Sequence, residues 1–247
     1  MGKYSLVAKN AILGDGMIRV NKSTAAITYI STDLNLLKHK EALLKKEGLE
    51  ITVKKTQESG YGGSKTIHVY STTANEKVKE AWDVGIEALI KDLTKEDLIL
   101  WYLDDGSWHI IRHTMHLYSN ELNKEQSNAL INQIEKLFGV APSLRIDRKQ
   151  DGRQFYYLYF PRELVRIIRP EIKKYILENG IDTMLYKVGG KDFEEKPRRE
   201  FTDDQVRTLR NMHKNERMSA DEIAKRFGYS AIRINNLLEY KTYKNVI

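Results

Sequence analysis

Two short stretches of the sequence each place an acidic residue directly before a glycine, at the end of an apolar segment. They read AILGDG at residues 11–16 and WYLDDG at residues 101–106. The apolar segments have the character of helices, and the C-terminal end of a helix carries partial negative charge that disfavours a carboxylate. Either a bound cation compensates for Asp15 and Asp105, or each Asp-Gly pair simply ends a helix at a turn.

The same order of elements surrounds both stretches, which indicates two similar halves. Each half is expected to read helix–strand–strand–helix–strand–strand–helix. The expected helices are Tyr4–Leu13, Leu34–Glu47, Asn75–Ile90, Lys95–Leu103, Lys124–Phe138 and one starting at Pro161. The expected strands are Met17–Asn21, Ala25–Ser31, Glu50–Thr56, Lys65–Ser71, Trp108–Arg112, Met115–Ser119, Ser143–Arg148 and Gln154–Phe160.

If both halves fold alike, their first helices pack side by side, with Gly14 and Asp104 near the closest approach. Asp15 and Asp105 then emerge together at one end of the helix pair. Paired carboxylates suit a hard divalent cation such as Mg²⁺. Next to a phosphodiester, such an ion polarises the phosphoryl oxygen and generates hydroxide for in-line attack. Because the motif recurs in register, we favour a shared site over two unrelated turns.

Composition narrows the class of partner. The chain has 247 residues, 41% of them hydrophobic, a formal net charge of +7 and a pI of about 9.2. Basic residues are spread along the chain with tyrosines between them, which favours a nucleic-acid partner over a merely well-solvated surface. There is no cysteine, which excludes disulfides, zinc–thiolate sites and thiol nucleophiles. No apolar run approaches a membrane span or a signal sequence, so we expect an intracellular protein without a membrane partner.

The last part of the chain has a different character. Residues 191–200 are rich in charge and read as a linker, so we expect halves at 1–92 and 93–190 and a small helical domain at 201–247. Capping boxes at Thr202 and Ser219, a helix over Ala220–Phe227 and a turn at Gly228 predict a helix-turn-helix. A plain three-helix bundle is the alternative. The residues expected to face DNA are Ser230, Arg233, Asn235 and Asn236 in the second helix, with Lys241 and Lys244 after it.

The segments AILGDGMI and LILWYLDDGSW resemble the paired motifs of the LAGLIDADG homing endonucleases of the single-chain, two-motif kind. The resemblance covers roughly Tyr4 to Gly190. It implies an α+β fold in which two pseudo-symmetric αββαββα halves form antiparallel DNA-binding sheets. It also implies that Asp15 and Asp105 bind a catalytic Mg²⁺ or Mn²⁺, whereas Asp104 matches a variable position and receives no ligand role.

The family also uses basic residues near the scissile phosphates. The segment MLYKVGG resembles a stretch that carries such a lysine, which makes Lys187 the candidate in the second half. In the first half, no lysine falls at the matching point near EAWDVGIEALIK. Either Lys91 takes this role or one half is less well equipped than the other.

Strand alternation predicts which side chains face the DNA groove. In each strand we expect the aliphatic residues to face the helices and the residues that alternate with them to face the DNA. The residues expected to face the helices are Ile51, Val53, Ile67, Val69, Leu144 and Ile146. The predicted DNA-facing residues are Thr52, Lys54, Thr66, His68, Tyr70, Arg145 and Asp147, with Arg19, Asn21, Arg112 and Gln154 as further candidates.

The leading interpretation is a site-specific, intron-encoded DNA endonuclease that works as a monomer. It would cut both strands of a long asymmetric DNA target with the help of Mg²⁺ or Mn²⁺. A non-catalytic transcription regulator with the same fold and a C-terminal helix-turn-helix is one alternative. An RNA maturase that binds its own intron RNA is another. The presence of both acids favours the nuclease, and the helix-turn-helix favours a bacterial or phage source.

Overall fold

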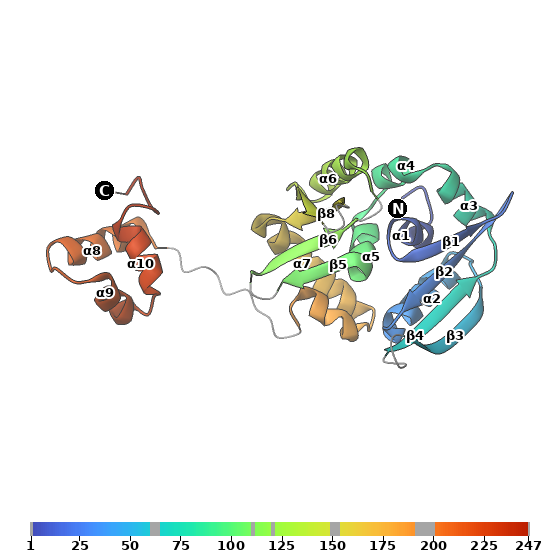
Figure 1. Cartoon of the computed structure of the whole chain (residues 1–247), viewed down its shortest axis with the longest axis horizontal. Helices are drawn as coiled ribbons and strands as arrows, with labels where there is room; N and C mark the ends of the chain where they lie inside the picture. The colour runs from blue at the N-terminus through green and yellow to red at the C-terminus, as the bar shows by residue number, and fades with distance from the viewer. Residues whose placement is uncertain are drawn as a thin grey trace. The chain divides into compact units, whose positions relative to one another are not determined.

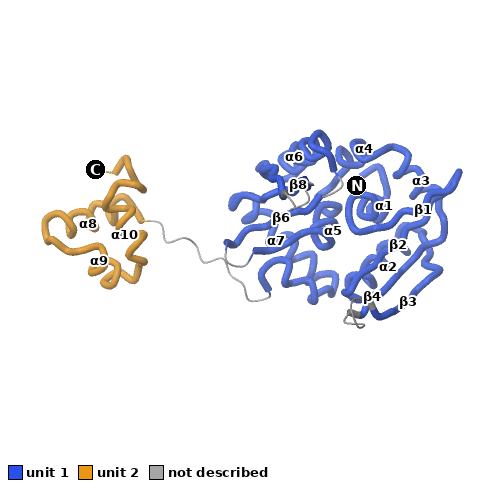
Figure 2. The backbone as a smooth tube through the Cα atoms, viewed as in Figure 1, with its two compact units in different colours: residues 1–193 blue, residues 194–247 orange. Residues whose placement is uncertain are grey.

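The computed structural model describes residues 2–59, 65–109, 112–119, 122–148, 154–190 and 201–246. The chain divides into two compact units, residues 1–193 and 194–247, which Figure 2 shows in different colours. The expected linker at 191–200 lies outside the described residues. Among the helices of the described ranges, none has both the length and the apolar character needed to cross a membrane.

The first unit contains two four-stranded antiparallel sheets of the same topology, as the sequence predicts for two similar halves. The first sheet has the strand order β1-β2-β4-β3 and the second β5-β6-β8-β7. Their strands are β1 (Gly16–Val20), β2 (Ala25–Ser31), β3 (Ile51–Ser59), β4 (Lys65–Thr72), β5 (Gly106–His109), β6 (Thr114–Tyr118), β7 (Ser143–Arg148) and β8 (Gln154–Phe160).

Helices accompany each sheet, so the expected α+β class is confirmed (Figure 1). The first half contains α1 (Leu6–Leu13), α2 (Leu34–Lys46), α3 (Glu76–Asp83) and α4 (Ile86–Lys91). The second half contains α5 (Lys95–Asp105), α6 (Lys124–Phe138), α7 (Arg162–Glu178) and the 3₁₀ helix η2 (Asp182–Val188). The single helix expected over Asn75–Ile90 is wrong: Gly85 has φ 79° and separates α3 from α4. This positive φ suits glycine and interrupts the helical backbone.

The helices of the first half cover the face of the sheet that carries Tyr29 and Tyr70. These two residues are register partners on β2 and β4, and they are 1% and 8% exposed. The Tyr29 hydroxyl donates to the Val7 carbonyl of α1 at 2.6 Å, which fixes the sheet against this helix. We call the opposite face of each sheet, away from the helices, its open face.

The predicted orientation of β3 is wrong because of an irregularity in its pairing. The register with β4 shifts between Ile51 and Val53, so the side-chain alternation reverses at Thr52. As a result Lys54 pairs with Tyr70 and lies on the helix-covered face. Its ammonium group lies 2.6 Å from the Glu41 carboxylate of α2, while Val53 and Lys55 take the open face.

The predicted orientation of β4 is wrong for a second reason. Thr66, His68 and Tyr70 share one face, and Tyr70 is buried opposite Tyr29, so this set lies on the helix side. His68 accordingly contacts Thr56, its β3 partner, at 2.9 Å. Both faces of β4 carry apolar or aromatic residues, so its hydropathy pattern does not distinguish them.

In the second sheet the predicted alternation agrees with the structure. Leu144 pairs with the fully buried Leu158, and this face packs against the helices. Arg145 and Asp147 are exposed and belong to the open face. Gln154, at the exposed start of β8, alternates onto the side of Leu158 rather than the open face.

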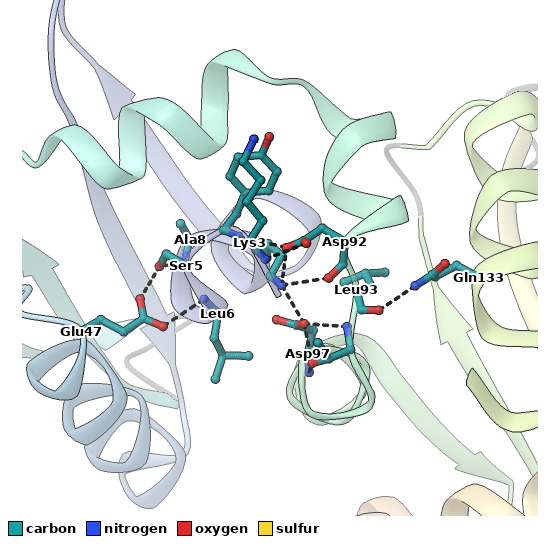
Figure 3. A network of polar contacts seen from close by, with 12 residues as sticks. Lys3, Ser5, Leu6, Ala8, Glu47, Asp92, Leu93, Asp97 and Gln133 are labelled. Carbon is teal, nitrogen blue, oxygen red and sulfur yellow. Dashed lines mark hydrogen bonds and ion pairs between the residues drawn. The ribbon is translucent and has the colours of Figure 1, made fainter. Parts of the chain in front are cut away.

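A polar network joins the two halves at the N-terminal ends of α1 and α5 (Figure 3). Glu47, the C-cap of α2, accepts hydrogen bonds from the Leu6 amide at 2.9 Å and from the Ser5 hydroxyl. Asp97 caps the start of α5 through Thr94. Lys9 of α1, which is 1% exposed, lies 2.7 Å from Asp97. Carboxylates at helix N-termini are favourably placed, so this network holds both helix starts together.

The second unit consists of α8 (Asp203–Lys214), α9 (Ala220–Phe227) and α10 (Ala231–Leu238). The predicted capping boxes at Thr202 and Ser219 are both formed. Gly228 follows α9 with φ 69°, as a left-handed helix end requires. Val206, Ile223 and their apolar neighbours form a separate small core.

Replacing Lys9 with methionine keeps the side-chain length but leaves Asp97 buried without its cationic partner. We expect the unfolding free energy of the first unit to fall by about 3–5 kcal/mol, the range for removing one partner of a buried ion pair. Urea unfolding followed by tryptophan fluorescence measures this unit alone, because all three tryptophans lie in residues 1–193.

The control is Lys174→Met, which removes an exposed ion pair with Glu178. This change is expected to lower the unfolding free energy by less than about 1 kcal/mol. Equal effects of the two substitutions would contradict the bridging role of Lys9.

Candidate active site

The packing of α1 against α5 brings the two acidic motifs together at one end (Figure 1). Glycine is required at position 14, where α1 crosses α5. A Cβ on Gly14 would lie 3.1 Å from the Trp101 ring and 3.3 Å from an Asp105 carboxylate oxygen. At Gly16 and Gly106 a Cβ would lie 2.4 Å or less from atoms of the preceding helix turn. These contacts explain why each acid is followed by glycine where a strand begins directly after a helix.

Asp15 and Asp105 meet at the C-terminal ends of these helices. Asp15 is exposed and Asp105 is half-buried, and the two side chains are in hydrogen-bond contact. Burial raises the pKa of Asp105 to about 8, with a further contribution from the negative charges of Asp15 and Asp104. The Trp101 indole donates a hydrogen bond to Asp105 at 2.9 Å and opposes this shift. The pair therefore has an excess of negative charge that a bound cation would relieve.

Asp104 has a different environment from its neighbour. Its carboxylate is 4% exposed and lies 2.7 Å from the Lys40 ammonium of α2. The Asn10 side chain of α1 donates a second contact at 2.8 Å. Asp104 is thus already neutralised by groups of the first half, which agrees with its having no expected ligand role.

Lys187 of η2 lies beside the acid pair. Its ammonium donates to the carbonyl oxygens of Asp104 and Gly106 at 2.9 and 2.7 Å. Burial lowers the pKa of Lys187, and the charges of Asp104, Asp105 and Asp15 act in the opposite direction. The Tyr102 hydroxyl holds the backbone of this residue through the Lys187 carbonyl, at 2.9 Å.

Three carboxylates and two ammonium groups therefore gather at this end of α1 and α5. Lys40 is committed to Asp104, and Lys187 to carbonyls at the end of α5. Asp15 and Asp105 are left with a net negative charge, to which both helix ends add partial negative charge. Within the described ranges, no three His, Cys, Asp or Glu side chains gather closely enough to hold a metal by themselves. An ion at this pair would need further oxygen ligands, such as backbone carbonyls, water or substrate phosphates.

Lys91 does not provide a cation at this site. It immediately precedes Asp92, whose carboxylate contacts Lys3, Tyr4 and Lys9 near the N-terminal ends of the two helices. The length of α5, roughly 16 Å at 1.5 Å per residue, separates that end from the acid pair. The lysine of the first half that does lie here is Lys40, which the sequence analysis missed. A signal was present, because Lys40 interrupts the apolar stripe formed by Leu37 and Leu44.

The open face of the second sheet carries an aromatic cluster that the sequence analysis also missed. The His116 ring centroid lies 5.3 Å from that of Tyr157 and 5.6 Å from that of Tyr159. Tyr118 stacks near Tyr157 at 5.6 Å, and Arg145 lies over the Tyr159 ring. The alternation in β8 does not reveal this cluster, since aromatic residues occupy both of its faces.

The remaining predicted DNA-facing residues are scattered over exposed and half-buried positions. Arg19 is on the open face of β1, Asn21 follows that strand, and Arg112 lies in the turn between β5 and β6. In the second unit, Ser230 caps α10, and Arg233 lies over the rings of Phe201 and Tyr229. Asn235 and Lys241 contact Glu239, Asn236 is half-buried and Lys244 is exposed.

The protonation of Asp105 predicts a pH-dependent stability in the absence of a divalent cation. Its folded-state pKa of about 8 lies above the ordinary carboxyl value of about 3.9, so the folded chain binds more protons between these limits. The unfolding free energy of the first unit should therefore fall as pH rises from 5 to 8. Urea midpoints followed by tryptophan fluorescence measure this slope.

Asp105→Asn should remove this part of the slope, whereas Asp182→Asn, which changes an exposed acid, should leave it intact. Added Mg²⁺ should stabilise the wild-type chain more at pH 8 than at pH 5.5, because protons compete with the ion. A slope unchanged by Asp105→Asn would show that this carboxyl titrates normally.

The comparisons with known proteins come from solved structures. Family models and curated proteins give no significant match. The homing endonuclease I-WcaI bound to its DNA recognition sequence aligns over 76% of this chain and 86% of its own, with 17% identity and a TM-score of 0.61. Full-length DUF199/WhiA from Thermatoga maritima aligns over 95% of this chain and 89% of its own, with 14% identity and a TM-score of 0.45. I-DmoI in complex with DNA and Mn covers 70% of this chain and 93% of its own, with 13% identity and a TM-score of 0.42.

The match to I-WcaI agrees with the two sheets of identical strand order and with the paired helices between them. The chain therefore has the LAGLIDADG fold of the homing endonucleases.

Proposed function

We propose that this protein is a metal-dependent, site-specific endonuclease that cuts both strands of a long asymmetric DNA target. The observation that carries the proposal is the contact of Asp15 from one half with Asp105 from the other, at the ends of two tightly packed helices. A regulator without catalysis has no need for an uncompensated acid pair, because like charges in contact destabilise the folded state.

The residues present fit a divalent cation. Asp15 and Asp105 supply two carboxylates, and Mg²⁺ is commonly held by one or two carboxylates together with water and substrate phosphates. Asp104 is excluded as a ligand because Lys40 and Asn10 occupy its carboxylate. A bound ion would polarise the scissile phosphate and lower the pKa of an attacking water.

Lys187 would act on the phosphate from the protein side. An ammonium group has three protons, and two of these are used on the carbonyls of Asp104 and Gly106. The third is available to a phosphate oxygen that approaches Asp105. The two carbonyl contacts fix the direction of this donor, so little side-chain freedom is lost when DNA binds.

The two open faces are the proposed binding surfaces for the DNA major groove. Antiparallel strands can enter this groove and read base edges. Arg19, Asn21 and Thr52 on the first half and Arg112, Arg145 and Asp147 on the second remain candidate contacts. Because each half carries its own open face with different residues, the preferred target would be asymmetric. A monomer would suffice for cleavage, since a single chain holds both acids. We also propose that the protein is encoded in an intron and that intron RNA is a second binding partner.

Cleavage of DNA that spans the encoding locus, with the coding segment removed, tests the proposal. The wild-type protein is expected to make one double-strand break that requires Mg²⁺ or Mn²⁺. Asp15→Asn and Asp105→Asn should each slow cleavage by more than about a hundredfold, since a metal contributes several kcal/mol of transition-state stabilisation. Gel-shift measurements should find that binding of the same DNA is retained. Each substitution removes a negative charge of the protein that would otherwise repel the DNA phosphates.

The matched control is Asp182→Asn, an exposed acid of η2, which should cut at the wild-type rate. Cleavage by both active-site variants would contradict the assignment of the acids. Specific binding by the wild-type protein without any cleavage would instead support the non-catalytic regulator.

The unequal lysines predict unequal cutting of the two strands. Lys187 serves one side of the acid pair, whereas Lys40 is 3% exposed and paired with Asp104. Lys187→Met should therefore slow one strand more than the other and cause nicked DNA to accumulate. Single-turnover cleavage of plasmid DNA, with each strand labelled separately, measures both rates. An equal loss on both strands would show that Lys187 has no strand preference.

A further inference from the structure

A positively charged groove lies on the second unit, between α8 and the segment that follows α10. It has a volume of about 610 Å³, within the range of about 300–1,000 Å³ found for ligand sites. No carboxylate is among its lining residues, which are Arg207, Thr208, Arg210, Asn211, Lys214, Asn215 and Tyr240. Arg207 forms an ion pair with Asp204 at 3.2 Å, whereas Lys214 is exposed and forms no ion pair with the described residues.

Tyr240 provides an aromatic surface at this groove. Its side chain is 51% exposed although it packs on an arginine: the Arg210 guanidinium carbon lies 3.7 Å from its ring centroid. Arg210 itself is buried and donates to carbonyls of the C-terminal segment, among them Leu237 at 3.1 Å and Tyr243 at 3.2 Å. The ring is thus supported on one face by a fixed cation and is partly exposed to solvent.

The backbone at Tyr240 adopts a conformation that non-glycine residues seldom use. Its φ is 55°, in the left-handed region, which is disfavoured for a residue with a side chain. The chain reverses here through hydrogen bonds from the amides of Lys241 and Thr242 to the Asn236 carbonyl, at 2.9 and 3.1 Å. This reversal places the ring over Arg210 instead of continuing α10.

We propose that this groove binds an unpaired nucleotide of a single-stranded nucleic acid, with the base stacked on Tyr240. Proteins that bind single strands combine a cationic groove for the backbone with aromatic rings on which bases stack. Lys214 supplies a charge for a phosphate. The Asn215 side chain donates to that of Asn211, and their remaining amide groups can contact a sugar or base edge. The contact with Arg210 strengthens the platform, because a guanidinium against an aromatic ring is itself stabilising.

The same observations argue against a duplex at this groove. In double-stranded DNA the base faces are covered by their neighbours, so an aromatic ring cannot stack on them without opening the helix. The groove is also formed by α8 and the C-terminal segment, while four of the residues predicted to face duplex DNA, Ser230, Arg233, Asn235 and Asn236, belong to α10 and its N-cap. The proposal therefore adds a second kind of nucleic-acid contact to this unit and does not depend on the acid pair.

Photocrosslinking on the full chain tests the proposal directly. Twelve-nucleotide single strands with one 5-iodouracil, as DNA in one arm and RNA in another, are irradiated with the protein. The same DNA strand in a duplex forms the third arm. Peptide mass spectrometry should find the adduct on Tyr240 with single strands and lose it with the duplex. The stronger of the first two arms identifies DNA or RNA as the source of the nucleotide.

Substitutions separate stacking from a role in folding. Tyr240→Leu should weaken single-strand binding about tenfold, whereas Tyr240→Phe, which retains the ring, should stay within about twofold of the wild type. Lys214→Met should reduce the slope of log affinity against log salt by about 0.7, the value for one phosphate of a single strand. The absence of a Tyr240 adduct in both single-strand arms would overturn the proposal, even if Tyr240→Leu failed to fold. Equal binding by folded Tyr240→Leu and Tyr240→Phe would also overturn it.

Discussion

Repulsion between two carboxylates, Asp15 and Asp105, is the interaction that the rest of the first unit must accommodate. They are brought into contact because α1 and α5 cross closely at Gly14. Both lie at helix ends that already carry partial negative charge. The fold tolerates this by leaving Asp15 exposed and by raising the pKa of Asp105, so that a proton can be shared between the two carboxylates. This arrangement supports the proposal that the pair binds a divalent ion.

Three other acids near the helix pair, Asp92, Asp97 and Asp104, each lie against an ammonium group, and this distinguishes them from the acid pair. At the opposite end, Lys9 lies between Asp92 and Asp97 and links the two halves. Beside the acid pair, Lys40 neutralises Asp104. The neighbouring acids Asp104 and Asp105 thus have opposite environments, one buried against a lysine and one facing another carboxylate. That difference separates a structural acid from a candidate ligand more clearly than their shared position in the motif does.

Much of this arrangement could be predicted from the sequence, because it depends on periodicity and repetition. The paired motifs, the glycine that follows each acid and the capping boxes of the second unit all have local signals. The failures have physical causes. The alternation predicted Lys54 to point outward, but a bulge at Thr52 reverses it. Tyr70 is buried beside Tyr29, its partner on a strand that is adjacent in the sheet but far away in the sequence. Lys40 and Arg210 were missed because buried cations are recognised only through partners that the fold supplies.

The central claim is that Asp15 and Asp105 form one charged site across the two halves. Carbon-detected NMR of the chain with ¹³C-labelled aspartate measures it directly, by following the Asp105 carboxyl carbon as pH is raised without and with Mg²⁺. The account predicts titration near pH 8 without the ion, a lower pKa when Mg²⁺ is present, and a lower pKa in Asp15→Asn. Titration of Asp105 near pH 4, unaffected by the ion and by Asp15→Asn, would contradict it.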